Sequence, residues 1–412
     1  PARTISARGL RPAQPSAPVQ RPGPANPRIV SSAHGPLGWL LFCYPAYAAG
    51  EYTYRDIYTD LFRKLPGESR LTVLTHPEVL GDLQRVVAEA GVSDRTTIVE
   101  APAYLDFLVW AEDPYVVVHD PPSAIFLVEP FTFTRGGDAV IADLVAEAEQ
   151  MRRTQSPLYF QGGNILVGDD FVLIGEDYPV QSVELIREHE HVRVPGGGDP
   201  PAFVKELYRT TFDPDRKILY VGTRLPVPRE HRRTFTNGGQ VWKEDVYAGT
   251  GEHQPIFHID MFITLAGRGP SGKYRLLVGS PAEAARVLDE KEPSPYALAA
   301  QLDDVAASLA AIGFEVIRNP LPLTYVDDRS RRLRTWYFAT ANNCLVQIDE
   351  KAGNHVWLPT YGHGDWGDLR ATDEANRALW QDLGFAVHLL GDFHPFAQNL
   401  GAVHCIKKYL AR

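Results

Sequence analysis

Short apolar runs alternate with longer amphipathic segments along the chain from Leu37 onward. Runs of four to eight apolar residues predict buried strands, and apolar residues spaced three and four apart over longer stretches predict helices. Strands are predicted at 38–46, 70–76, 96–102, 115–120, 124–130, 171–177, 217–222, 256–267, 274–281, 314–320 and 385–391. Helices are predicted at 54–65, 77–91, 139–153, 294–313 and 373–384.

The order of these elements is repetitive. A strand, one or two helices and a further strand recur every 60 to 80 residues or so, which indicates about five α/β units and not one doubly wound sheet. The sequence has no GxGxxG after its first strand and no GxxxxGK[ST]. It therefore gives little support to a dinucleotide site or a P-loop nucleotide site.

The first 28 residues differ from the rest, with seven prolines, five arginines and no acidic residue. Such a composition cannot form a core and predicts an extended, disordered tail at 1–28. Residues 29–412 are then expected to form a single domain.

Composition narrows the function classes. A 412-residue chain with 44% hydrophobic and 22% charged residues is typical of a globular protein, and no stretch approaches the ~18 apolar residues of a membrane span. A net charge of −10 disfavours a nucleic-acid surface and suits a cationic small molecule or peptide. Three scattered cysteines favour a reducing, cytoplasmic compartment, with secretion after removal of an unseen signal left open.

Four short stretches carry candidate chemistry: WAEDP at 110–114, YFQGGNILVG at 159–168, FHIDMF at 257–262 and GAVHC at 401–405. His258 and Asp260 stand two apart in a predicted strand, so both should project from one face. Each stretch also has a structural interpretation: a turn before proline, a hairpin with a bulge, a histidine and an aspartate that satisfy each other, and a buried cysteine that only fills space.

Together, a cysteine, a histidine and two aspartates on separate units match the needs of attack on a guanidinium. The guanidinium carbon is a poor electrophile, because its positive charge is spread over three nitrogens. Its conversion requires a strong nucleophile, a proton shuttle and anions that hold the cation, and these side chains supply all three.

The ordered motifs WAEDP, GGN, HID and GAVHC resemble the guanidino-group-modifying superfamily, the penteins, and most of all the catalytic domain of protein-arginine deiminases. The segment HIDMFITLAGRGPSGKYRLLVGSP is similar to that family's HxDEF and RLLLASP strands, and DFHPFAQNLGAVHC to its DFF…GEVHC end. The resemblance runs from about Trp110 to Cys405. It implies an α/β fold, a five-bladed propeller of ββαβ-type units with pseudo-fivefold symmetry, as one catalytic domain over 29–412.

The resemblance also implies residue roles. Cys405 is the expected nucleophile and His258 the general acid and base, with Asp113 and Asp260 as the carboxylates that grip the guanidinium. Arg135 is expected to contact the substrate's backbone. A substrate-binding role is also expected for Trp110, Gly163 and Asn164.

Two departures from the deiminases matter. They carry an arginine shortly before the terminal glycine, where this chain has QNL before Gly401. The animal enzymes bind activating calcium through acidic side chains, whereas Val116 and Leu166 occupy the positions that align here. Because calcium needs oxygen ligands, we expect calcium independence and predict no metal and no cofactor.

The predicted activity is hydrolytic deimination of a guanidino group, from an arginine side chain to citrulline plus ammonia, through a covalent Cys thiouronium intermediate. The expected partner is an arginine-containing peptide or a small guanidino substrate, without nucleic acid or membrane, and the sequence leaves the exact substrate and the oligomeric state open. The alternatives are an amidinotransferase of the same superfamily, a non-catalytic pentein that binds a partner, and a metal hydrolase that uses His189, His191, His363 and Asp365.

Overall fold

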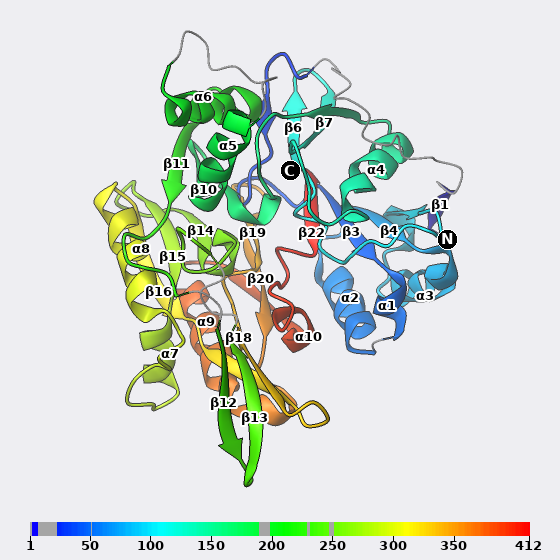
Figure 1. Cartoon of the computed structure of the whole chain (residues 1–412). Coiled ribbons are helices and arrows are strands. Elements are labelled where there is room, and N and C mark those ends of the chain that lie inside the picture. The colour runs from blue at the N-terminus through cyan, green and yellow to red at the C-terminus, as the bar shows by residue number, and fades with distance from the viewer. Residues whose placement is uncertain (1, 7–22, 51, 189–197, 229–230, 247–250) are drawn as a thin grey trace. The chain divides into compact units, whose positions relative to one another are not determined.

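The computed structural model describes residues 2–6, 23–50, 52–188, 198–228, 231–246 and 251–412. It is a mixed α/β protein with several separate sheets (Figure 1). Its internal contacts divide the chain into two compact units. Unit 1 comprises Pro1–Ile174, Tyr178–Leu219 and Cys405–Arg412, and unit 2 comprises Gly175–Asp177 and Tyr220–His404.

The larger sheet of unit 1 joins the two ends of the chain. Its strand order is β1 (Arg3–Ser6), β5 (Thr96–Glu100), β4 (Arg70–Thr75), β3 (Trp39–Tyr44) and β22 (Lys407–Ala411). The first four strands run parallel, and β22, the red strand beside β3 in Figure 1, runs antiparallel to β3. The helices α1 (Ala46–Gly50), α2 (Tyr52–Lys64) and α3 (Leu80–Glu89) connect these strands.

Residues 3–6 and Arg28 belong to the stretch predicted as a disordered tail, and they lie in the strands β1 and β2. Residues 3–6 are the longer of these two segments. They pair with β5 from Thr97 to Glu100, because an extended segment satisfies its backbone groups on an open sheet edge. Residues 7–22 lie outside the described part of the chain.

Two further sheets lie wholly or mainly in unit 1. One has the order β2 (Arg28–Ile29), β6 (Val116–Asp120), β7 (Ala124–Glu129) and β8 (Arg152–Gln155), with α4 (Ile141–Glu149) before β8. The other has the order β11 (Lys217–Val221), β10 (Phe171–Gly175) and β9 (Ile165–Val167), with α5 (Asp177–Glu188) and α6 (Pro200–Phe212) between β10 and β11. Side chains of β3, β6, β7 and α4 share one hydrophobic core.

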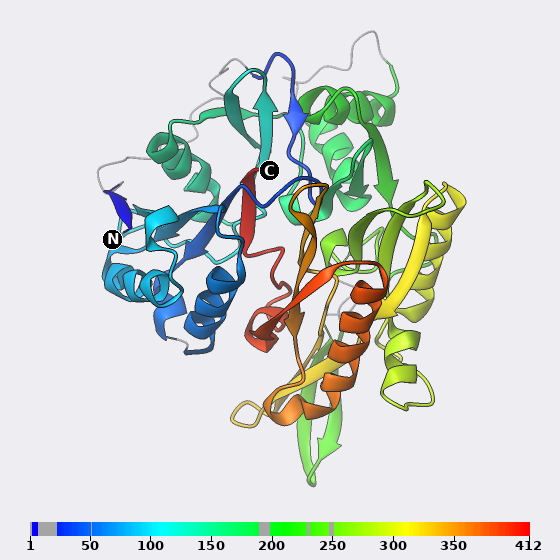
Figure 2. The same cartoon turned by 180° about the vertical axis from the view of Figure 1, so that it is seen from behind.

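Unit 2 contains two three-stranded sheets in which the strands follow the order of the chain. They are β14 (Ile263–Arg268), β15 (Tyr274–Ser280) and β16 (Glu315–Pro320), and β19 (Leu345–Asp349), β20 (Gly353–Thr360) and β21 (Ala386–Asp392). The helices α7 (Pro281–Val287) and α8 (Ala299–Ala311) precede β16, and α9 (Arg370–Asp382) precedes β21, against which it packs (Figure 2). The short helix α10 (His394–Ala397) follows β21.

Unit 2 also carries a sheet that the sequence did not predict. Its order is β12 (His231–Asn237), β13 (Gln240–Val246), β18 (Leu333–Phe338) and β17 (Leu323–Asp328). Most described side chains of β13 before Glu244 are exposed, so the apolar run that marks a strand is missing there.

One local pattern explains the spacing of the predicted units. In the sheets β6–β8, β14–β16 and β19–β21, the first strand pair is antiparallel and the second is parallel. The parallel connection passes through a helix, as it must when two parallel strands are joined within one sheet. This pattern confirms the predicted ββαβ units in these three sheets, and the closed five-bladed propeller stays a prediction.

Two predicted elements are corrected. The strand at 256–267 begins only at Ile263, because Ile259–Met261 form a 3-10 turn, η6, in which the Met261 amide donates to the His258 carbonyl. The helix at 139–153 ends at Glu149, where Gln150 adopts a left-handed conformation that stops α4 before β8. No helix in the described residues is long and apolar enough to cross a membrane.

Candidate functional site

Asp113 is held at the centre of a buried loop in unit 1. Its side chain is 5% exposed, and its Oδ1 accepts a hydrogen bond from the Gly163 amide at 3.2 Å. Its backbone carbonyl accepts from the amide of Gly162, also at 3.2 Å. The loop that carries Asp113 is therefore held by the turn η4 (Gly162–Asn164), whose two glycines let the backbones approach each other closely.

Arg135 is the cationic partner of Asp113. Its Nη2 lies 2.8 Å from Asp113 Oδ2, and its Nε lies 2.8 Å from Asp138 Oδ2. Burial lowers the pKa of Arg135, but the charges of Asp113, Asp138 and Cys405 outweigh it and raise that pKa above its ordinary value. The guanidinium therefore stays charged and pairs with both carboxylates, and the contact with a substrate backbone stays a prediction for Arg135.

Asp138, which the sequence did not single out, should make the free energy of unfolding depend on pH. Burial raises its pKa to about 6, although Arg135 and the Leu108 amide act in the opposite direction. An unfolded aspartate titrates near 3.9, so the folded state binds this proton more tightly, and the stability it adds at low pH is lost as pH rises through about 6.

We therefore expect the free energy of unfolding of the wild type, minus that of Asp138→Asn, to fall by about 2 to 3 kcal/mol between pH 4 and pH 7. Urea-induced unfolding of both proteins at each pH measures this difference. A difference that stays constant over this range contradicts the raised pKa.

Cys405 lies in a turn two residues before β22 and not within a strand, and it is 3% exposed. Its backbone carbonyl accepts a hydrogen bond from the Glu112 amide at 3.1 Å, so the Cys405 segment runs beside the Asp113 segment. The other two cysteines, Cys43 and Cys344, are buried, and burial raises the pKa of both thiols. Both are therefore packed core residues.

Unit 2 holds the other two predicted catalytic residues. His258 is fully buried, and its ring lies 4.0 Å from that of Phe257, centroid to centroid. Asp260 sits in η6, and its Oδ2 lies 2.8 Å from His404 Nδ1. His258 and Asp260 are thus presented by a tight turn, and not by alternate positions of one strand as predicted.

His404 is a site residue that sequence reasoning missed. Its ring holds the Asp260 carboxylate, and its backbone is joined to Cys405 by a peptide bond. Asn343 supports this segment, because its Oδ1 accepts from the Ala402 amide at 3.0 Å. The signal available in the sequence was the position of His404 directly before the cysteine.

The turn that carries Asp260 is held by buried polar side chains. Thr340 Oγ1 donates to the Met261 carbonyl at 2.7 Å, and Gln254 Nε2 donates to the Phe257 carbonyl at 2.8 Å. Both side chains are fully buried, so these bonds are shielded from water and fix the conformation around His258.

The predicted residues thus fall into two groups. Unit 1 places the segments of Cys405, Asp113, Arg135 and Gly163 next to one another, and unit 2 places His258 beside the turn of Asp260. The remaining predicted residues are buried near Asp113 in the chain or in η4: Trp110 at 9% exposure and Asn164 at 0%.

The metal-hydrolase alternative gains no support. His189 and His191 lie outside the described residues, and the His363 ring pairs with Thr360 Oγ1 at 2.7 Å. In the part of the chain that the structure describes, no group of three or more His, Cys, Asp and Glu side chains could hold a metal ion. Val116 and Leu166 are buried strand residues, and calcium independence stays a prediction.

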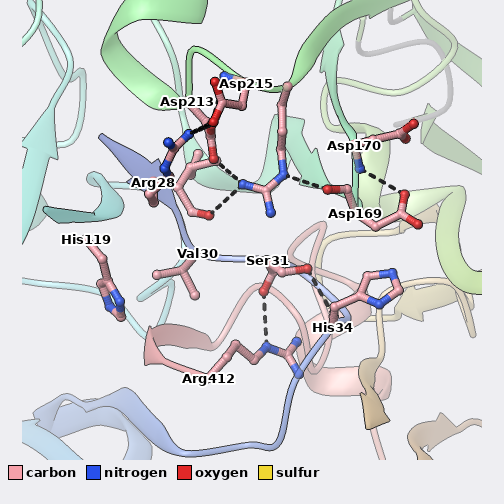
Figure 3. Close-up of a pocket in the computed structure, with 12 residues that line it drawn as sticks. Arg28, Val30, Ser31, His34, His119, Asp169, Asp170, Asp213, Asp215 and Arg412 are labelled. Carbon is pink, nitrogen blue, oxygen red and sulfur yellow. Dashed lines mark hydrogen bonds and ion pairs between the residues drawn. The ribbon is translucent and has the colours of Figure 1, made fainter. Parts of the chain in front are cut away.

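Unit 1 also has a polar pocket of about 460 Å³ (Figure 3). Figure 3 shows Arg28 directed at Asp213, 2.9 Å away, and Arg412 directed at the Ser31 carbonyl, 3.1 Å away. Its cations are thus engaged by groups of the pocket itself, and its lining includes no cysteine. Without a nucleophile it does not match the predicted chemistry.

Comparison with known proteins gives a result at the level of fold. No protein-family model and no curated protein matches the chain. Solved structures do match: the agmatine deiminase of Enterococcus faecalis superposes with a TM-score of 0.59 at 14% identity, covering 93% of this chain and 95% of that one. The agmatine deiminase of C. jejuni gives 0.58 at 12% identity, covering 93% and 96%.

A candidate peptidyl-arginine deiminase gives a TM-score of 0.60 at 11% identity, covering 94% of this chain and 99% of that one. Identities this low establish the fold and nothing finer. They nevertheless agree with the resemblance that the ordered motifs carry, since these neighbours are deiminases. The chain therefore has the fold of the solved agmatine deiminases and of the candidate peptidyl-arginine deiminase.

Proposed function

We propose that the protein is a hydrolase that deiminates a guanidino group and releases ammonia. The observation that carries the proposal is the setting of Cys405. Its carbonyl is bound by the residue next to Asp113, and its peptide neighbour His404 holds Asp260. These two contacts, one in unit 1 and one in unit 2, are made by consecutive residues of the chain, which has the fold of known deiminases.

Substrate binding uses the two carboxylates. A guanidinium is planar and presents paired N–H groups, so Asp113 and Asp260 can each accept from one edge. Each carboxylate already has a partner in the protein, Arg135 and His404, which fixes its orientation before substrate arrives. Less conformational freedom is then lost when the cation binds.

The reaction divides into two steps. In the first, the Cys405 thiolate adds to the guanidinium carbon, His258 protonates one nitrogen, and the C–N bond breaks to release ammonia. This leaves a thiouronium on the sulfur. In the second, His258 takes a proton from water, the water oxygen adds to the same carbon, and the C–S bond breaks. The products are a ureido group and the free thiol.

The charge around Cys405 favours this nucleophile once substrate is bound. Two carboxylates near a thiol disfavour the thiolate, whereas Arg135 and the cationic substrate favour it. Arg135 is close enough to Cys405 for their charges to interact. The thiolate population is therefore expected to rise when the guanidinium is bound.

Three finer assignments belong to this proposal: the substrate, the closed propeller and calcium independence. The solved neighbours include agmatine deiminases and a candidate peptidyl-arginine deiminase, so both a small guanidino compound and an arginine side chain of a peptide are candidate substrates. We propose the arginine side chain, with citrulline as product, because the ordered motifs most resemble those of protein-arginine deiminases. The closed five-bladed propeller and calcium independence are part of the same proposal.

An ammonia-release assay tests the function. Purified protein is incubated with agmatine, free arginine and an arginine-containing peptide, each with and without a calcium chelator. Ammonia release with a ureido product, unaffected by chelator, is the expected result. Transfer of the amidino group to an added amine, detected by mass spectrometry, would instead identify an amidinotransferase, and no turnover of any guanidino compound would contradict the proposal.

A further inference from the structure

Two consecutive lysines follow the candidate nucleophile, and both are buried. The side chains of Lys407 and Lys408 are 0% and 4% exposed. Lys407 Nζ lies 2.6 Å from Glu112 Oε2, and Lys408 Nζ lies 3.0 Å from Glu112 Oε1. One carboxylate, itself only 9% exposed, therefore pairs with two ammonium groups. We call these three residues the lysine–glutamate triad.

Such an arrangement is costly. Moving three charges out of water carries a large desolvation penalty, and a well-packed apolar set of similar volume is often as stable or more stable. Consecutive strand residues also project to opposite faces, yet both ammonium groups converge on one carboxylate where β22 begins. Stability alone does not account for this use of charge, so a positional role is the better explanation.

Glu112 is where three functional segments meet. Its amide donates to the Cys405 carbonyl, and its carboxylate binds the side chains two and three residues after that cysteine. It directly precedes Asp113 in the chain. The nucleophile segment is thus attached at both its backbone and its side chains to the segment of the substrate-binding carboxylate.

The third segment is the turn η4. A Cβ added at Gly162 would lie 2.0 Å from the Glu112 carbonyl oxygen and 2.7 Å from Lys408 Nζ. The turn therefore packs directly on the triad, and Gly162 and Gly163 donate in turn to the backbone and side chain of Asp113. Only a glycine fits at 162 without displacing one of these groups.

We propose that the lysine–glutamate triad is a positioning device that fixes Cys405 relative to Asp113. This inference rests on the proposed function for its meaning in catalysis. The structural part of the proposal is that Glu112 holds the Cys405 segment closed. This part can be measured without any enzyme turnover. Because Cys405 is 3% exposed, local opening of its segment should speed the reaction of its sulfur with an alkylating reagent.

The test compares Glu112→Gln with Glu149→Gln. Glu149 is a matched control in unit 1: its side chain is 3% exposed, it pairs with Arg70, and it accepts from Thr72 Oγ1 at 2.6 Å. Alkylation of Cys405 by iodoacetamide is followed from pH 6 to pH 9 by peptide mass spectrometry. The buried Cys43 in β3 serves as an internal reference for global opening.

For Glu112→Gln we expect Cys405 alkylation to accelerate by about tenfold relative to Cys43. The reason is that the Cys405 segment should spend more time in its open form once the ion pairs are weakened. We expect kcat for ammonia release to fall by about a hundredfold with a smaller change in KM, since small misplacements of reacting groups cost that much. Glu149→Gln should change the alkylation rate of Cys405 and kcat by less than about twofold. It should lower Tm about as much as Glu112→Gln does.

The failures are distinguishable. Faster Cys405 alkylation in a protein whose wild type releases no ammonia would support the positioning role and contradict the proposed function. Alkylation and kcat that change no more in Glu112→Gln than in Glu149→Gln would overturn the inference. If Glu112→Gln does not fold, Lys408→Met replaces it, because it leaves the Glu112 pair with Lys407 intact and should show smaller changes in the same direction.

Discussion

Replacement of Cys405 by alanine should abolish ammonia release from any guanidino substrate of this protein. The proposed reaction has no path around the sulfur, because water is a weak nucleophile toward a carbon whose charge is spread over three nitrogens. We expect kcat to fall by about 10⁴-fold or more, as is usual when a covalent nucleophile is removed. Ammonia release under saturating substrate measures the loss.

The same variant also tests the covalent intermediate. In the wild type, rapid quenching during turnover followed by mass spectrometry should find a substrate-derived adduct on the peptide that contains Cys405. That adduct should be absent from Cys405→Ala. Its appearance on another residue, or turnover near the wild-type rate in the variant, would remove Cys405 from the mechanism.

A matched control is provided by Cys43→Ala. Cys43 is a fully buried cysteine of the same unit, within the hydrophobic core. Its replacement should lower Tm by removing packed atoms. Because it contacts no substrate in the proposed reaction, kcat should stay close to that of the wild type.

Replacement of His258 by alanine should have the second-largest effect. The proposed mechanism uses this imidazole twice, to protonate the leaving nitrogen and to activate water. We expect kcat to fall by about 10²- to 10⁴-fold, the usual range for a general acid and base. KM should change much less, because the carboxylates that bind the guanidinium are retained. Steady-state kinetics across pH measure both.

His394→Ala is the control for a buried histidine of unit 2. His394 is 1% exposed, and its ring nitrogens lie 2.7 Å from Tyr337 Oη and 2.7 Å from the Tyr361 carbonyl. Its loss should lower Tm without a comparable loss of kcat. Equal kinetic losses in the two variants would mean that His258 acts only through folding.

Much of the fold could be read from the sequence because several of its strands are buried on both faces. The segments at β3 and β10 are nearly continuous apolar runs, those at β4 and β5 combine apolar residues with threonine, and all four are found where they were predicted. Helices such as α3 and α9 were found from their apolar periodicity. The exposed strands β12 and β13 were missed, because half-solvated hairpins lack that signal.

The site shows the same division. Cys405, His258, Asp113 and Asp260 could be named in advance from residue types and their order along the chain. Their local geometry could not, because a strand and a 3-10 turn around His258 differ by two backbone hydrogen bonds that no periodicity encodes. The side-chain partners Arg135 of Asp113 and His404 of Asp260 are likewise contacts over long sequence separations.

The sequence by itself determined which residues can do chemistry and in which order the α/β units follow one another, since both are carried by local pattern and side-chain type. Only the tertiary structure decided that Glu112, Lys407 and Lys408 form one buried ion cluster. In the sequence a lysine pair near the end of the chain is typical of a solvated surface. Its burial depends on a carboxylate almost three hundred residues away, |i−j| = 295, and only folding brings the two together.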